Sequence, residues 1–313
     1  MGSRTPSSPS AAAVRYRPLE PADVAACERI SAVEFHAVDL ARARRGEPEP
    51  LPRSPERAGR WIDRTTSLVR TDPAGCWVAE VEDTVVGFAT SVVRERLWAL
   101  VTFAVGAPWQ GHGIGRGLLE RAAAAGAACD VALLSASEDP RALASYWRDG
   151  FVLHPQWTFT GVPRRSPPPA PEPAVRPGTA ADLVWMDDVD RERRGGPHGP
   201  DHLALAAMTG GADAAGWPGL LVAQDRSGYL WATPTETFVV AGREESAARG
   251  LLAGWLRRAH AAGEAVTISH VTDANRWAHD LAMSAGLNAS VEGFLGVRGG
   301  PAPTAYVHNG ALL

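Results

Sequence analysis

Glycines occupy every second position from Gly111 to Gly117 in the stretch QGHGIGRG, which starts at Gln110. The apolar run VTFAV before them predicts a buried strand, and the run of good helix formers after them predicts a helix. The glycines therefore predict a strand-to-helix turn whose backbone N–H groups are not shielded by side chains. Such a turn binds anionic phosphate through those N–H groups and the helix dipole.

Three kinds of phosphate-binding loop compete for this stretch. All 31 basic residues are arginine, so no lysine is present for the GxxxxGK[ST] loop of nucleoside triphosphatases. A dinucleotide fingerprint needs GxGxxG and a ribose-binding acid downstream, and this sequence has neither at the required spacing. The remaining pattern, Gln110-x-x-Gly113-x-Gly115, resembles the Q/R-x-x-G-x-G/A signature of the GCN5-related N-acetyltransferases (GNAT), whose loop binds the pyrophosphate of acetyl-CoA.

The resemblance extends over most of residues 14 to 160 and implies the cofactor contacts. Acetyl-CoA is the implied co-substrate, and no metal is expected. The family's backbone amides that hold the thioester carbonyl correspond here to Phe103, Ala104 and Val105. The implied pyrophosphate contacts come from the whole loop: Gln110, Gly111, His112, Gly113, Ile114, Gly115 and Arg116.

A second element, DPRALASYWRDGF, resembles the family's N-x-x-A-x-x-x-Y-x-x-x-G-F. Asp139 replaces the usual Asn, so this chain departs from the pattern at an implied cofactor contact. Tyr146 falls where a tyrosine hydroxyl protonates the departing thiolate, which makes it the expected general acid. The alternative for Tyr146 is a core residue on an amphipathic helix.

An incoming amine must lose a proton to a base or a bound water. The candidates for the base are Glu34, His36, Asp39 and Glu95, and of these Glu34 or Glu95 is the predicted one. For each of these residues a solvated surface group is the alternative.

The elements that must position these residues occur twice along the chain. A proline-dense segment at 161–173 predicts an extended linker. We expect a disordered tail at 1–13, a catalytic acetyl-CoA-binding domain at 14–160 and a degenerate GNAT-like domain at 174–313. Each half has the pattern of a strand, helices, three strands, helix, strand, helix and strand. This order predicts an α/β fold of two tandem GNAT-like domains, each a mixed, mostly antiparallel sheet with helices on both faces.

The second copy repeats the plan of the first but lacks its proposed chemistry. Arg17 and Asp23 recur at one offset as Arg176 and Asp182, near the start of a helix in each half. Aligning RGLLERA with RGLLAGW places REESAA opposite QGHGIG, so two glutamates stand where a pyrophosphate would lie. Ala282 falls opposite the tyrosine. The second copy could form a wall of the acceptor pocket, stiffen the first domain or mediate formation of a homodimer.

Composition excludes several classes of function. The hydrophobic content of 45% and charged content of 21% are those of a globular protein. No apolar run reaches the length of a membrane helix, and the net charge of −4 without a basic cluster argues against nucleic acid as a partner. Three cysteines without metal spacing suit a cytoplasmic protein. His198 and His202 have a spacing that metals use, but Gly199 and Pro200 between them argue against a helix presenting both.

We therefore expect a cytoplasmic N-acetyltransferase that moves acetyl from acetyl-CoA to a primary amine of a small molecule by direct attack. Similar tandem proteins of high-GC bacteria act on mycothiol precursors and cationic antibiotics, so an antibiotic is one candidate acceptor. Two alternatives stay open, a non-catalytic acyl-CoA sensor or scaffold and a protein or peptide N-acetyltransferase.

Overall fold

The computed structural model describes residues 13–43, 49–167, 173–210 and 217–313. Most of the predicted tail and the centre of the predicted linker lie outside these residues. The chain forms two compact units, one from residues up to Ser91 together with Thr102–Ala125, the other from Val92–Val101 together with Gly126–Leu313. The division runs through strands β3 and β4, so it differs from the predicted domain boundary at 161–173, which stays a prediction.

The first unit holds strands in the order β1–β2–β3–β4, with β1 antiparallel to β2 and β2 antiparallel to β3. The turn between β2 and β3 uses Glu82 and Asp83 at positive φ, as a tight hairpin requires. The buried face of α3 consists of Ile114, Leu118, Leu119 and Ala122. The elements are β1 (Arg15–Pro18), α1 (Val24–Arg42), α2 (Pro55–Thr71), β2 (Cys76–Val81), β3 (Thr84–Arg94), β4 (Leu97–Val105) and α3 (Ile114–Ala124), with short 3₁₀ turns η1 (Pro21–Asp23), η2 (Pro73–Gly75) and η3 (Ala107–Trp109).

The second unit contains two runs of strands, β4–β5–β12–β6–β11 and β13–β10–β9–β8–β7. Apart from the parallel pair β4 and β5 and one parallel bridge between Glu236 and Thr267, the pairs described in this unit are antiparallel. The strands are β5 (Val131–Ala136), β6 (Val152–Gly161), β7 (Val175–Pro177), β8 (Leu220–Ala223), β9 (Gly228–Ala232), β10 (Thr237–Gly242), β11 (Val266–Thr272), β12 (Asn288–Arg298) and β13 (Tyr306–Val307). The helices are α4 (Pro140–Arg148), α5 (Leu183–Arg194), α6 (Asp201–Met208), α7 (Glu245–Ala262) and α8 (Arg276–Ser284), with 3₁₀ turns η4 (Ala180–Asp182) and η5 (Asp273–Asn275).

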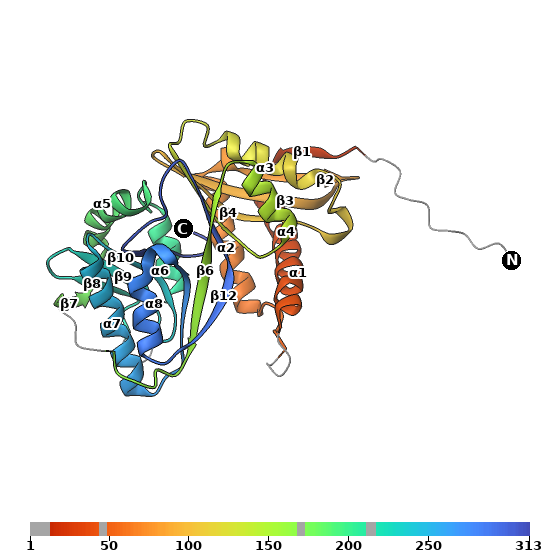
Figure 1. The fold of residues 1–313 in the computed structure, drawn as a ribbon. Helices are drawn as coiled ribbons and strands as arrows, with labels where there is room; N and C mark the ends of the chain where they lie inside the picture. The colour runs from red at the N-terminus through yellow and green to blue at the C-terminus, as the bar shows by residue number, and fades with distance from the viewer. Residues whose placement is uncertain (1–12, 44–48, 168–172, 211–216) are drawn as a thin grey trace. The chain divides into compact units, whose positions relative to one another are not determined.

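Strand β12 comes from the C-terminal half of the sequence but pairs with strands of the N-terminal half. It lies antiparallel between β5 and β6, and β6 in turn pairs with β11 (Figure 1). The two repeats therefore interleave their last strands within one sheet. The repeat pattern did not predict this exchange, because the pattern of each strand fixes its faces but not its neighbour.

The predicted order of elements is confirmed in both halves, and so is the mixed, mostly antiparallel α/β class. The repeated arginine and aspartate form the same bidentate ion pair twice. Arg17 donates to Asp23 at 2.6 and 2.8 Å, and Arg176 donates to Asp182 at 2.8 and 2.6 Å. In each half the aspartate also accepts the backbone N–H three residues before it, which fixes the entry into the helix.

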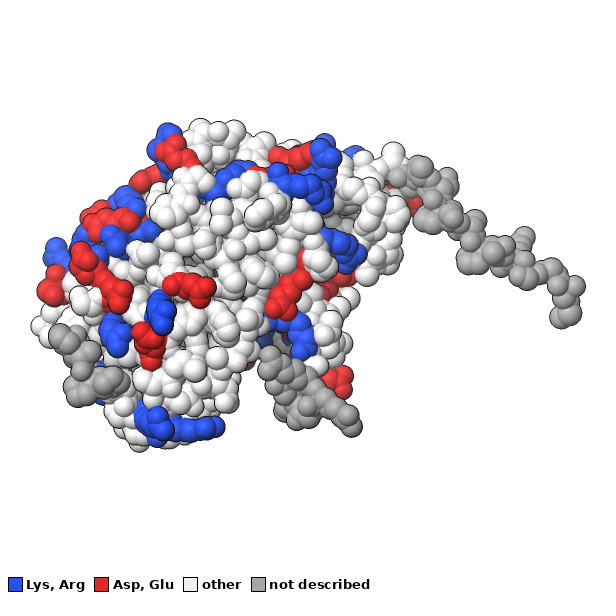
Figure 2. Space-filling view, viewed as in Figure 1, with Lys and Arg blue, Asp and Glu red and all other residues white. Residues whose placement is uncertain are grey.

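The surface carries both signs of charge. On the face that Figure 2 shows, arginines and acidic residues alternate, in keeping with the small net charge. Among the described residues, the helices are too short or too polar to cross a membrane.

Candidate active site

Gly111 and Gly113 give the turn after β4 its shape. Both adopt a left-handed backbone, with φ of +80° and +81°, and a Cβ built on either would meet no atom of the described residues within 4 Å. Gly113 caps α3, and the first helical hydrogen bond runs from Gly117 N–H to Gly113 O at 3.2 Å. The N–H groups of Ile114 and Gly115 come before that bond, so the helix itself offers them no acceptor. The result is an open cradle of amides at a positive helix end.

The next two glycines serve packing. A Cβ on Gly115 would lie 3.0 Å from the ring of Phe103, and one on Gly117 would lie 2.4 Å from the Tyr16 hydroxyl. These glycines let α3 approach the sheet closely, while the preceding pair leaves space for a ligand. The alternating glycines thus meet two requirements, which are open space at the turn and close packing of the helix that follows it.

A hydrogen-bonded brace holds the turn in place. Gln110 Nε2 donates to Val105 O and to Glu34 Oε2, both at 2.8 Å. Glu34 Oε1 accepts the N–H of Ala107, also at 2.8 Å. Both oxygens of Glu34 therefore accept hydrogen bonds. Together these bonds, the brace, connect the end of β4, the turn and α1. His112 adds a local contact, with Nδ1 2.8 Å from Gln110 O.

The remaining residues of the predicted cofactor site lie on β4 and α3. Ala104 and Val105 are buried and Phe103 is half-buried at the end of β4. Arg116 is exposed on the first turn of α3 and pairs with Glu120 at 2.7 Å.

The other base candidates differ in their surroundings. His36 is half-buried on α1, and its buried Nδ1 has no hydrogen-bond partner among the described residues. Asp39 is exposed three residues further on. Glu95 lies in the tight turn that precedes β4, at φ +57°, and accepts hydrogen bonds from Arg191 at 2.9 and 3.2 Å. The glycine turn follows β4, so the whole nine-residue strand separates it from Glu95 along the chain.

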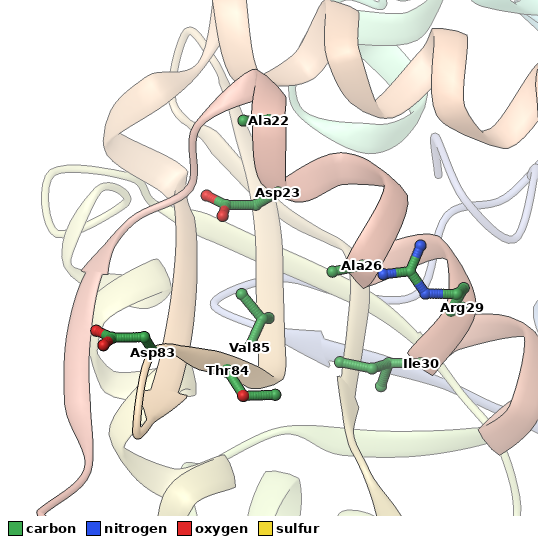
Figure 3. Close-up of a pocket in the computed structure, with 8 residues that line it drawn as sticks. All are labelled: Ala22, Asp23, Ala26, Arg29, Ile30, Asp83, Thr84 and Val85. Atoms are coloured by element: carbon green, nitrogen blue, oxygen red, sulfur yellow. The ribbon is translucent and has the colours of Figure 1, made fainter.

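A hollow of about 460 Å³ opens on the first unit between the start of α1 and the β2–β3 turn (Figure 3). Asp23 on its wall is already paired with Arg17. The predicted site residues do not line it; Ile30 on its wall lies one helical turn before Glu34. Its full lining consists of Ala22, Asp23, Ala26, Arg29, Ile30, Asp83, Thr84 and Val85.

In the second unit, α4 carries the two residues of the second motif. Asp139 is the N-cap: its Oδ1 accepts the N–H of Arg141 at 2.9 Å, which explains an aspartate at this position independently of any cofactor. Gly150, at φ +83°, ends the helix and lets Phe151 N–H reach Tyr146 O at 3.0 Å.

Tyr146 is buried, with 5% of its surface exposed, and its ring meets that of Phe151 edge to face at 6.2 Å. Its hydroxyl forms no hydrogen bond with a described residue. Burial raises the pKa of this phenol well above its ordinary value of 10. The hydroxyl therefore stays protonated near neutral pH and is available as a donor.

The structure brings His198 and His202 together and adds Asp190 from α5, which the sequence analysis missed. All three are buried, and one potential ligand atom from each lies within 4.8 Å of the others. His198 Nδ1 is 2.7 Å from Asp190 Oδ2, and the Tyr229 hydroxyl donates to Asp190 Oδ1. The signal that could have found Asp190 is the helical spacing of the acidic run DDVD.

Proton positions in this cluster argue against a metal site. An arginine can only donate, and Arg194 Nη1 lies 3.2 Å from His198 Nε2, so that nitrogen is the acceptor and Nδ1 carries the proton toward Asp190. Burial and the Arg194 charge lower the pKa of His198 to about 4, which keeps it neutral. Both nitrogens of His198 are thus engaged. Arg194 also donates to Leu312 O at 2.8 Å, so the cluster anchors the C-terminal segment.

Residues 37–151 match the sequence profile of the acetyltransferase (GNAT) family. A comparison with curated proteins finds no match. A candidate acetyltransferase from Pyrococcus horikoshii covers 100% of this chain, and 99% of its own, with a TM-score of 0.67 at 15% identity.

Two further solved structures share the fold. The GCN5-related N-acetyltransferase from Sphaerobacter thermophilus covers 93% of this chain and 97% of its own, with a TM-score of 0.52 at 15% identity. The one from Kribbella flavida covers 91% and 72%, with a TM-score of 0.55 at 16% identity. The chain therefore has the fold of these proteins over nearly its whole length.

Proposed function

Because residues 37–151 are a domain of the acetyltransferase (GNAT) family, we propose that this chain transfers acetyl from acetyl-CoA to a primary amine of a small molecule. Acetyl transfer is the reaction of the family. The observation that carries the proposal is the open, left-handed cradle at Gly111 and Gly113. In this proposal the amides from Gly111 to Arg116 hold the pyrophosphate, where any side chain on the two glycines would take up the space.

The roles proposed for the remaining residues follow from the charges that develop on the thioester as it reacts. The amine nitrogen attacks the thioester carbon, and the carbonyl oxygen becomes an oxyanion. Backbone N–H groups at Phe103 to Val105 would stabilise that oxyanion, each contributing about 3 kcal/mol. As the C–S bond breaks, the Tyr146 hydroxyl gives its proton to the sulfur. The Tyr146 hydroxyl forms no hydrogen bond with a described residue, so it can donate to the sulfur, and this supports the role.

The proton that leaves the amine needs an acceptor whose oxygens are not already used to hold the turn in place. Glu34 holds the loop with both oxygens, and Glu95 is paired with Arg191, so we assign Glu34 to positioning and the proton to bound water. The proposal of a small acceptor rests on the resemblance to tandem proteins of high-GC bacteria.

The test measures free thiol released from acetyl-CoA across a panel of amines that includes simple amines, basic antibiotics and peptides with free N-termini. Turnover with a small amine that is lost in Gly113→Glu supports the proposal. Turnover only with peptides would favour a peptide N-acetyltransferase, and binding of acetyl-CoA without turnover on any amine would favour a sensor.

A further inference from the structure

Helix α2 carries a positive charge on its buried face. Trp61 and Leu68 are buried there, and Arg64 shares their face because it lies three residues after the first and four before the second. The Arg64 side chain is half-buried, and its Nε is a buried atom without a hydrogen-bond partner among the described residues. No described carboxylate forms an ion pair with it. Arginine is almost never buried unless it is paired, so this position calls for an explanation.

A second guanidinium, that of Arg53, lies on the same side of the helix. Arg53 Cζ is 5.7 Å from the centre of the Trp61 ring. Arg53 is itself paired, because it donates to Glu28 Oε1 at 3.0 Å and to Ser31 Oγ at 2.9 Å. Burial and the like charge of Arg53 lower the pKa of Arg64 from 12.5 to about 10, which leaves Arg64 charged at neutral pH. Among the described residues, the two arginines therefore share more positive charge than Glu28 neutralises.

The outer end of the Arg64 guanidinium is open to a ligand. Neither Nη forms a hydrogen bond with a described residue, and neither belongs to the atoms that are buried without a partner. The half-buried side chain therefore reaches solvent through its Nη atoms. The planar N–H groups of a guanidinium match a carboxylate, which accepts two parallel hydrogen bonds from them.

The two arginines lie close to the brace that holds the glycine turn, and both features belong to the first unit. Ser31, which accepts from Arg53, and Glu34, the centre of the brace, are three residues apart on α1. Three residues of a helix span about 4.5 Å. Because the same segment of α1 makes both contacts, the arginines lie near the turn that the proposed function assigns to acetyl-CoA.

We propose that Arg64, with Arg53 beside it, binds a carboxylate of the acceptor, so that the amine acetylated by this chain is an amino acid or another small amine with a carboxylate. This inference rests on the proposed function and names its class of acceptor. The carboxylate supplies the negative charge that the described residues around Arg64 lack. A cationic antibiotic is disfavoured, since the arginines would repel a further positive charge on the acceptor.

The first measurement compares acceptors with and without a carboxylate. Free thiol released from acetyl-CoA is followed with the unbranched ω-amino acids from glycine to 5-aminopentanoate, and with the alkylamine of the same number of carbons. At least one amino acid is expected to have a kcat/KM about tenfold above that of its alkylamine, which is the size of one charge-assisted hydrogen bond. Arg64→Met should remove this preference. Arg70→Met, on an exposed position of the same helix, should keep it.

The second measurement does not depend on acetyl transfer. Thermal unfolding of the full chain is followed without acetyl-CoA, in buffer and with each of the same amines. In buffer, Arg64→Met should unfold about 2 °C or more above the native chain, because it removes an unpaired charge from a desolvated position, and Arg70→Met should not. The amino acid preferred as acceptor should raise the midpoint of the native chain but not that of Arg64→Met. Arg64→Gln, which removes the charge and keeps a polar end, should lose the response to amino acids in both measurements.

The two measurements separate failure of this inference from failure of the proposed function. If the native chain acetylates none of the amines, acetyl transfer to this class fails, and a midpoint raised by an amino acid but not by its alkylamine still supports the carboxylate site. If amino acids and alkylamines are equivalent in both measurements, or if Arg64→Met and Arg64→Gln keep the preference for an amino acid, the inference is overturned while acetyl transfer stands on its own result.

Discussion

The helices that follow β4 and β10 begin in different ways, although the repeats align there. Before α3 the chain turns through left-handed Gly111 and Gly113, and the space beside their backbone is open. Before α7 the chain is extended at the N-cap, Glu244, with φ of −132°. The carbonyl of Glu244 accepts the N–H of Ala248 at 3.3 Å, and Glu244 and Glu245 are exposed at the helix end.

The difference shows two ways to satisfy a positive helix end. The α7 helix carries its own carboxylates there, and Arg243, which replaces Gln110, is paired with Glu192. The α3 helix has no acid in its first turn, and in the proposed function its amides hold the diphosphate. The two repeats therefore keep the same order of elements while their equivalent helix ends differ in charge and backbone conformation.

The largest effect that would test this comparison is expected from Gly113→Glu. The carboxylate would fill the cradle and repel the diphosphate, so acetyl-CoA should bind at least about 100-fold more weakly. Calorimetry of acetyl-CoA binding measures the change. Gly113→Asn, which tolerates the left-handed backbone, separates charge from strain. The matched change Ser246→Glu in the second repeat should leave binding unaltered; a loss there would contradict the comparison.

Tyr146→Phe should reduce kcat by about 100-fold or more, because it removes the hydroxyl proposed as the general acid. The dissociation constant of acetyl-CoA should stay the same, since the turn is unchanged. Steady-state kinetics and calorimetry on one preparation check both. Unchanged turnover would assign Tyr146 to the core alone.

Glu34→Gln should weaken acetyl-CoA binding by about tenfold, because an amide cannot accept from Ala107 N–H and Gln110 Nε2 as a carboxylate does. The pH dependence of kcat should keep its shape. Loss of the basic limb of that profile with normal acetyl-CoA affinity would instead make Glu34 the base. Asp39→Asn on the exposed part of α1 is the matched control.

The smallest effect concerns the repeated ion pairs. Asp182→Asn should lower the free energy of unfolding by about 1 kcal/mol more than Asp23→Asn, because Asp182 also accepts from Trp185 Nε1 at 3.0 Å. Arg176 holds the pKa of Asp182 well below its ordinary value of 3.8, so this stability is present above that value and is lost as the pH falls below it. Chemical denaturation at pH 7 and pH 3 measures it. Equal costs at pH 7 would contradict the prediction.

Local patterns predict much of this molecule. The glycine spacing predicted the turn and α3, and the repeated order of elements predicted the helix α4 that carries Tyr146. The pairing of β12 with β5 and β6 could not be predicted from the sequence, because strand partners are set by packing between residues far apart in the chain. The brace role of Glu34 was missed for the same reason, since 76 residues separate it from Gln110. Asp190 lies beside His198 and His202 because of tertiary packing, which the spacing of these residues in the sequence does not indicate.

A crystal structure with acetyl-CoA tests the central claim most directly. The diphosphate should lie on the backbone N–H groups between residues 111 and 116, with no second molecule at Arg243 to Ala248. A complex in which acetyl-CoA occupies the second repeat and leaves the glycine turn empty would contradict the account.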